Sequence, residues 1–148
     1  RKAKTVIYSG PLDALFGYRL GRLEYRSLRF EQSHLPGDFQ GIATVNYTDL
    51  EKPFTRILEH RHYWRLKVSH TVVTREYPEP YTGENEPYYP VGGERNAELY
   101  RQYTRLLAEL PWLRVGGRLG SYQYYNIDQA LGQAAVMAAR LIEERNHE

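Results

Sequence analysis

The sequence of 148 residues contains no cysteine and no long apolar run. Without cysteine the chain has no disulfide, no thiolate nucleophile and no thiolate metal ligand, which is typical of a reducing compartment, and we expect a cytoplasmic protein. Its apolar runs are far shorter than the roughly 20 residues that a membrane-spanning helix needs, and none of them resembles a signal peptide. We therefore expect a soluble chain with no membrane partner.

An excess of charge of one sign is also lacking. The chain has 20 lysines and arginines against 18 acidic residues, which gives a net charge of +2. This balance creates no strong field over the whole molecule, so we do not expect nucleic acid as a partner, and any anion site must be local. The hydrophobic content of 41% is enough for one core, or for one lobe of a larger protein.

Tyrosine is abundant where phenylalanine is scarce: the chain has 14 tyrosines and 4 phenylalanines. A phenol combines an apolar ring with a hydroxyl that can bind oxygen-rich ligands. Tyrosine also suits half-buried strands, so one tyrosine alone indicates little. Only clusters of tyrosines are evidence for a binding site.

The hydrophobic pattern predicts an α+β fold in which strands precede most of the helices. We expect strands at residues 4–8, 23–35, 41–47, 66–77 and 113–117, and residues 53–60 remain open. Four prolines between residues 78 and 93 predict an irregular loop.

Three helices are expected. The first covers residues 13–18, the second begins at a cap formed by Asn96, and the third follows Asn126. The predicted buried face of the third helix consists of Ile127, Leu131, Ala134, Ala135, Ala138 and Ile142.

The segment GGRLGSYQYYNID at residues 116–128 concentrates glycines, one arginine and three tyrosines before the last helix. Asn126 and Gln129 have the spacing of a capping box, and a helix N-terminus attracts anions. Glycines allow the backbone to approach an anion closely, and Arg118 adds a permanently charged planar donor. Short glycine motifs also form plain turns, so the pattern by itself leaves both interpretations open.

Five segments of the chain resemble motifs of one family, and they occur in the order expected for that family. GGRLGSYQYYNIDQAL, VIYSGPLDALFGYRLGRLEYRSLRFE, NYTDLEKPFTRILEH, REYP and EPYYPV are similar to motifs in the C-terminal part of bacterial UDP-galactopyranose mutases, over about residues 6–135. The resemblance implies a twisted antiparallel sheet plus a strand-loop-helix element of an FAD-binding, Rossmann-like domain. No GxGxxG motif follows a first strand here, so we expect the N-terminal half of that domain to be absent. Residues 1–19 and 95–148 would belong to the flavin domain, and residues 20–94 to a substrate domain.

The implied function is a portion of a flavin-dependent isomerase that interconverts UDP-galactopyranose and UDP-galactofuranose for galactofuranose-containing glycans. In the family, N5 of reduced FAD forms an adduct with the sugar, and NAD(P)H or another donor supplies the reduced form. The implied partners are the substrate UDP-galactose and the missing N-terminal part. Uncovered apolar surface would favour a homo-oligomer. We expect the 148 residues alone to be inactive.

The resemblance also assigns residues. Arg56, Tyr89 and Tyr124 match catalytic residues that bind the substrate diphosphate, and Tyr88 is the alternative to Tyr89 because the register of the doublet is ambiguous. The cofactor-binding residues would be Gly117, Arg118, Tyr125, Asn126 and Ile127. Asn126 stands where the family commonly has aspartate, which puts in doubt any role that requires a carboxylate there.

Two other interpretations remain open. The tyrosine-rich sheet also suits a noncatalytic module that binds sugar nucleotides or glycans, and, less well, a nucleic-acid-binding sheet. His60 and His62 would share one face of a strand as half a metal site, but the sequence indicates no third ligand nearby, and we expect no metal.

Overall fold

The computed structural model describes residues 3–146 of the chain, which divides into two compact units. The first unit combines the N-terminal segment up to Arg26 with the C-terminal segment from Pro87, and the second covers Ser27–Glu86. Within the described residues, no helix combines the length and the apolar character that a membrane crossing requires.

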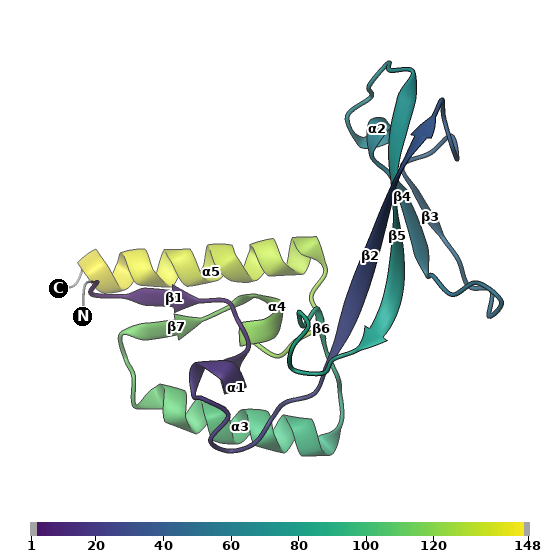
Figure 1. Cartoon of the computed structure of the whole chain (residues 1–148). Helices are drawn as coiled ribbons and strands as arrows, with labels where there is room; N and C mark the ends of the chain where they lie inside the picture. Colours follow the sequence, from purple (N-terminus) through teal and green to yellow (C-terminus); the bar gives the residue numbers. More distant parts are fainter. Residues whose placement is uncertain (1–2, 147–148) are drawn as a thin grey trace. The chain divides into compact units, whose positions relative to one another are not determined.

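The first unit contains most of the helices (Figure 1). Its elements are β1 (Val6–Tyr8), α1 (Leu12–Leu15), the first residues of β2 (Tyr25–Pro36), β6 (Tyr89–Pro90), α3 (Glu94–Ala108), β7 (Leu113–Val115), α4 (Gly117–Gly120) and α5 (Ile127–Asn146). Strands β1 and β7 pair in parallel, with Val6 opposite Leu113. The start of β2 pairs antiparallel with β6, with Tyr25 opposite Pro90.

The core of the first unit forms where α1 and α3 pack together. Leu12, Leu23 and Tyr103 are buried there. The Tyr103 hydroxyl donates to the Gly21 carbonyl at 2.7 Å and accepts from the Leu20 N–H at 3.1 Å. A buried tyrosine with its hydroxyl bonded contributes apolar area without leaving a polar group unsatisfied.

The predicted cap of α3 is wrong. The helix begins at Glu94 with Gly93 as its N-cap, so Asn96 lies inside the first turn. Asn96 is buried, and its Nδ2 donates to a Glu24 carboxylate oxygen at 3.2 Å and to the Val91 carbonyl at 3.1 Å. The amide therefore ties the helix to neighbouring segments and does not cap it.

The predicted buried face of α5 is also wrong. The helix forms as expected, but none of its described side chains is buried, and Ile127 and Leu131 are 79% and 66% exposed. The half-buried positions are Ala130, Met137 and Leu141, which line a cavity of about 630 Å³ together with residues of β1 and β7. Apolar spacing identifies a helix, but it does not reveal whether this chain supplies a partner for each face.

The second unit contains an antiparallel sheet. Strands β3 (Thr44–Asn46), β4 (Arg56–Glu59) and β5 (His70–Pro80) lie in that order beside β2, and α2 (His60–Tyr63) follows β4 directly. In the register of the sheet, Arg56 lies opposite Asn46 on one side and Glu76 on the other. The open segment 53–60 thus forms a strand, and the placement of His60 and His62 on a strand is wrong because both are in α2.

The chain is a mixed α/β structure with a twisted antiparallel sheet. The predicted irregular loop at 78–93 is shorter than expected, because β5 extends to Pro80 and β6 forms at its other end. Two of the three prolines in these strands, Pro80 and Pro90, stand at strand ends, where a missing N–H costs little, and Pro78 lies two residues inside the end of β5.

Candidate functional site

Three of the residues singled out from the sequence meet in the first unit. The rings of Tyr89 and Tyr124 stack with their centroids 5.1 Å apart, and the Arg118 guanidinium carbon lies 4.7 Å from the Tyr89 centroid and 5.4 Å from the Tyr124 centroid. We call Arg118, Tyr89 and Tyr124 the Arg118 cluster. The cluster combines one permanent cation with two phenols contributed by different segments.

Backbone carbonyls fix the orientation of the Arg118 side chain. Its Nη2 and Nε donate to the Tyr125 carbonyl at 2.7 and 3.2 Å, and its Nη1 donates to the Tyr88 carbonyl at 3.4 Å. A guanidinium has five N–H donors in a rigid fork, so two remain for a ligand. Arg118 therefore connects the segment after α4 to β6.

The two phenol hydroxyls of the Arg118 cluster are available to a ligand. Tyr124 is 64% exposed and Tyr89 is half-buried. Among the described residues, neither hydroxyl has a hydrogen-bond partner, although both rings are fixed by stacking and by the cation. Two phenol O–H donors on stacked rings beside a cation are suited to anionic oxygens such as those of a diphosphate.

Close packing and backbone conformation explain why the GGRLG motif has glycines at these positions. Gly117 has φ +74°, a left-handed conformation that disfavours other residues, and a Cβ there would lie 3.5 Å from Ser9 Cβ. A Cβ on Gly116 would lie 2.9 Å from Met137 Cε, and one on Gly120 would lie 3.2 Å from the Tyr8 carbonyl oxygen. The motif thus lets α4 fit closely against β1 and the last helix.

The remaining predicted cofactor residues lie at the entrance to α5. The Tyr125 carbonyl accepts from Arg118, whereas Asn126 and Ile127 are exposed. The Asn126 N–H donates to Gln129 Oε1 at 2.8 Å, which is the return bond of the expected capping box. The entrance therefore offers exposed side chains and the N–H groups that any helix N-terminus leaves free.

Tyr122 is part of the same motif, but no sequence signal distinguished it from its neighbours. Its hydroxyl lies 2.7 Å from the Glu24 carbonyl and 2.8 Å from the Val91 carbonyl. Burial is the main cause that raises the pKa of Tyr122 to about 12, so the hydroxyl remains a donor at neutral pH. Its left-handed backbone, with φ 48°, cannot be read from the residue type.

Arg56 belongs to the second unit, where its side chain is braced across the sheet. Its Nε donates to Asn46 Oδ1 at 2.8 Å, and its Nη1 lies 3.5 Å from Glu76 Oε2. The Arg56 side chain is 40% exposed, whereas that of Glu76 is 9% exposed. The guanidinium is thus oriented by two neighbours and is still open to solvent. Sequence reasoning missed Asn46 and Glu76, because only the strand register brings them to Arg56.

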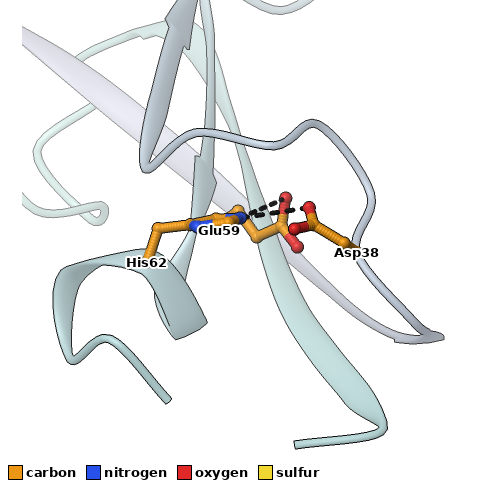
Figure 2. A group of neighbouring side chains, drawn as sticks. All are labelled: Asp38, Glu59 and His62. Carbon is orange, nitrogen blue, oxygen red and sulfur yellow. Dashed lines mark hydrogen bonds and ion pairs between the residues drawn. The ribbon is translucent and has the colours of Figure 1, made fainter. Parts of the chain in front are cut away.

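A second cluster in the same unit joins His62 to two carboxylates (Figure 2). His62 Nε2 lies 3.1 Å from Asp38 Oδ1 and 3.6 Å from Glu59 Oε2. The expectation that His62 has no further ligand-type groups nearby is therefore wrong. Both Glu59 oxygens already accept backbone N–H groups, from Phe39 at 3.0 Å and Gln40 at 2.8 Å.

These bonds give both Glu59 oxygens a partner within the chain. Burial alone would raise the pKa of Glu59, but hydrogen bonds, chiefly those from the Phe39 and Gln40 N–H groups, outweigh it and lower the pKa below the ordinary value. The hydrogen bond from His62, followed by that from the Gly41 N–H, lowers the pKa of Asp38. The cluster therefore ties the 38–41 loop to α2 and holds both acids ionised.

Comparison with known families supports the resemblance that the motifs indicate. A family profile described as UDP-galactopyranose mutase matches residues 1–124. The chain is 40% identical over 132 residues to a probable UDP-galactopyranose mutase of Klebsiella pneumoniae, which covers 87% of this chain and 34% of that protein.

Two further relatives match nearly the whole chain. A UDP-galactopyranose mutase of Mycoplasma pneumoniae is 34% identical over 95% of this chain and 37% of its own length. A dTDP-fucopyranose mutase of Escherichia coli is 30% identical over 97% of this chain and 38% of its own length. The chain thus spans about a third of the length of the curated relatives that it matches.

Proposed function

This chain belongs to the UDP-galactopyranose mutase family, and from that premise we propose that it is the C-terminal part of a flavin-dependent isomerase. The proposed reaction interconverts UDP-galactopyranose and UDP-galactofuranose. The relatives are about three times longer, so the activity is assigned to the complete protein that contains these residues. The isolated chain is expected to be inactive.

The Arg118 cluster is the observation that carries the proposal. Two stacked phenols, whose hydroxyls have no hydrogen-bond partner among the described residues, lie with their centroids 4.7 and 5.4 Å from the Arg118 guanidinium carbon. The chemistry fits a diphosphate, whose oxygens accept several charge-assisted hydrogen bonds. Ring contraction requires the diphosphate to leave the sugar and later to return to it, so the site must retain the departing anion.

Each residue of the cluster has a role in this scheme. The Tyr89 and Tyr124 hydroxyls donate to diphosphate oxygens and stabilise the charge that develops as the glycosidic bond breaks. The fixed charge of Arg118 strengthens this stabilisation, and its two remaining N–H donors face a bound anion or the cofactor. Because stacking and carbonyl bonds hold the groups in place, little reorganisation accompanies the reaction.

Within the second unit, and from the motif match, Arg56 is proposed to bind a phosphate oxygen as a planar donor. The contacts with Asn46 and Glu76 use Nε and Nη1, which leaves Nη2 for an anionic oxygen. A guanidinium held in one orientation loses less entropy on binding than a free side chain. Asn46 and Glu76 thus orient Arg56 without themselves binding the substrate.

The residues at the entrance to α5 fit FAD. Exposed Asn126 and Ile127 and the free N–H groups of the first helical turn suit the polar edge and the apolar face of a flavin ring. When bound, reduced FAD supplies nucleophilic chemistry at the anomeric carbon without net oxidation. We propose that Gly117, Arg118, Tyr125, Asn126 and Ile127 form this chain's share of the flavin site, in a Rossmann-like domain completed by other residues.

The nucleotide and the sugar are assigned from the relatives. The family description and two of the named relatives specify UDP-galactopyranose, while the Escherichia coli relative is named for dTDP-fucopyranose. Both are nucleoside diphosphate sugars, so the diphosphate is the shared feature that the Arg118 cluster would recognise. UDP-galactose is our first choice of substrate.

The test is an isomerisation assay on the complete gene product with UDP-galactofuranose, followed by chromatography of the nucleotide sugars. We expect conversion only with chemically reduced flavin, and we expect Tyr124→Phe to lower kcat/KM at least tenfold. Arg105→Ala is the matched control, since Arg105 is exposed on α3 and does not line the cavity that contains Tyr124. It should retain the wild-type rate.

Two results would contradict the proposal. Tight UDP binding without any conversion, unaffected by flavin, would indicate the noncatalytic sugar-nucleotide module. Conversion of dTDP-fucose with no conversion of UDP-galactose would retain the mutase reaction but reject the proposed substrate.

A further inference from the structure

Tyr122 has an unfavourable backbone conformation beside the Arg118 cluster. Its φ is 48°, in the left-handed region that L-residues with large side chains avoid. Such a conformation persists only where the surroundings impose it, and it is often found at functional sites. The contacts of the side chain show what imposes it here.

The Tyr122 side chain is held from three directions. It is 8% exposed, its ring stacks on Tyr100 at 5.6 Å, and Tyr25 meets it edge-on at 5.4 Å. Its hydroxyl lies within 2.8 Å of the Glu24 and Val91 carbonyls, and its single hydrogen can donate to either. The residue is therefore bound to the start of β2 and to the segment that follows β6.

The bond to Val91 joins the two segments that carry the stacked phenols. Tyr122 stands two positions before Tyr124, and Val91 stands two positions after Tyr89. The buried Tyr122 hydroxyl thus links the two segments close to both rings, in addition to the link that Arg118 makes through the Tyr88 and Tyr125 carbonyls.

Tyr124 has few other restraints. Its side chain is 64% exposed and contacts the Tyr89 ring and the Arg118 guanidinium. On its other side, the Tyr125 carbonyl accepts two bonds from Arg118. The backbone at Tyr124 is accordingly held between two anchors, Tyr122 before it and Tyr125 after it.

We propose that Tyr122 is a positioning residue for the diphosphate site, whose buried hydroxyl holds the loop of Tyr124 against the segment of Tyr89 so that both phenols reach one diphosphate. The inference rests on the function proposed above and adds a residue that never touches the ligand. The competing explanation is that Tyr122 is a core tyrosine that contributes only to stability.

The test compares Tyr122→Phe with Tyr103→Phe in the complete gene product. Each variant removes one buried hydroxyl that bonds to a backbone carbonyl and keeps the ring, but the Tyr103 hydroxyl bonds to Gly21 and Leu20, not to either segment of the cluster. Both variants should lower the melting temperature. UDP affinity is measured by calorimetry at 10 °C, well below unfolding. Tyr122→Phe should weaken UDP binding about fivefold, because the displaced Tyr124 hydroxyl loses its hydrogen bond to the diphosphate. Tyr103→Phe should weaken it less than twofold.

A double variant separates positioning from stability. In the Tyr124→Phe background the phenol that Tyr122 positions is already absent, so adding Tyr122→Phe should weaken UDP binding by less than twofold further. A purely structural role predicts the same factor in both backgrounds. Equal factors, or a Tyr122→Phe variant that binds UDP as the wild type does, would overturn the inference.

The same data distinguish the two proposals. If Tyr124→Phe weakens binding and Tyr122→Phe does not, the diphosphate site stands and the positioning role is rejected. If the wild type does not bind UDP, or if Tyr124→Phe has no effect, the proposed function of the cluster fails and the role of Tyr122 with it.

Discussion

The rings of Tyr89 and Tyr124 stack at 5.1 Å with an interplanar angle of 20°, although one belongs to β6 and the other to the loop before α5. Offset stacking of two phenols adds modest stability and fixes the two rings relative to each other. With Arg118 against both rings, we propose that the pair donates hydrogen bonds to an anion. The proposed function depends on this arrangement.

The backbone at Gly117 should not tolerate a side chain. Gly117→Ala imposes a Cβ on a residue with φ +74°, and we expect a loss of about 1 kcal/mol in the free energy of unfolding, measured by urea denaturation. Gly132→Ala is the control, because a Cβ on Gly132 within α5 meets nothing within 4 Å. Alanine should stabilise that helix by up to about 1 kcal/mol. Equal effects of the two changes would show that the left-handed conformation at Gly117 is not required.

The cluster of Asp38, Glu59 and His62 predicts a loss of stability in acid. The pKa values of Asp38 and Glu59 lie below the ordinary values of 3.8 and 4.5. Their ionised forms therefore stabilise the fold above about pH 5, and this contribution disappears as the pH falls through the lowered pKa values.

Removing one of these acids should make the stability of the fold less dependent on pH. Between pH 5 and pH 3, the melting temperature of Glu59→Gln should fall less than that of the wild type, as followed by circular dichroism. Glu51→Gln, which removes an exposed carboxylate, should retain the wild-type slope. A slope for Glu59→Gln equal to that of the wild type would argue against the assignment of the cluster.

The exposed apolar residues of α5 predict self-association of the 148-residue chain. Leu131 and Ile142 are 66% and 55% exposed, more apolar surface than a helix in water normally shows. Sedimentation velocity should detect oligomers, and Leu131→Gln with Ile142→Gln should reduce them. Arg140→Gln, an exposed polar change on the same helix, is the control. A wild-type chain that remains monomeric at high concentration would contradict the prediction.

The sequence predicted individual strands and helices better than it predicted which surfaces pack against them. Alternating residues predicted β2, β-branched residues predicted β5, and the spacing of Asn126 and Gln129 predicted a capping bond at the start of α5. The buried face of α5 was wrong, because hydrophobic spacing does not state where the covering surface comes from. Asn96 was misassigned because Gly93, one turn earlier, is an equally permissible cap.

The sequence indicated the candidate residues that meet in the Arg118 cluster, but not the residues that support the candidate site residues. Tyr89, Tyr124 and Arg118 came from motifs, whereas Tyr122, Asn46 and Glu76 act through backbone conformation and strand register. A single sequence contains neither kind of information directly. His62 in α2 could not be paired from the sequence either, because its partner Asp38 lies in a loop 24 residues earlier.

Arg56 should not be replaceable by lysine. Arg56→Lys keeps the charge but loses the planar fork that bonds to Asn46 while facing an anion, and we expect kcat/KM to fall by about 10²-fold in the isomerisation assay. Arg105→Lys on α3 should have no effect. A kcat/KM of Arg56→Lys within threefold of the wild type would show that Arg56 provides charge alone.

The central claim is that the two phenols bind a diphosphate, and its most direct test compares UDP with uridine by calorimetry in the complete gene product. For the Tyr89→Phe, Tyr124→Phe double variant we predict UDP affinity lower by about 25-fold, two lost hydrogen bonds, with uridine affinity unchanged. Unchanged UDP affinity, or an equal loss for uridine, would contradict the account.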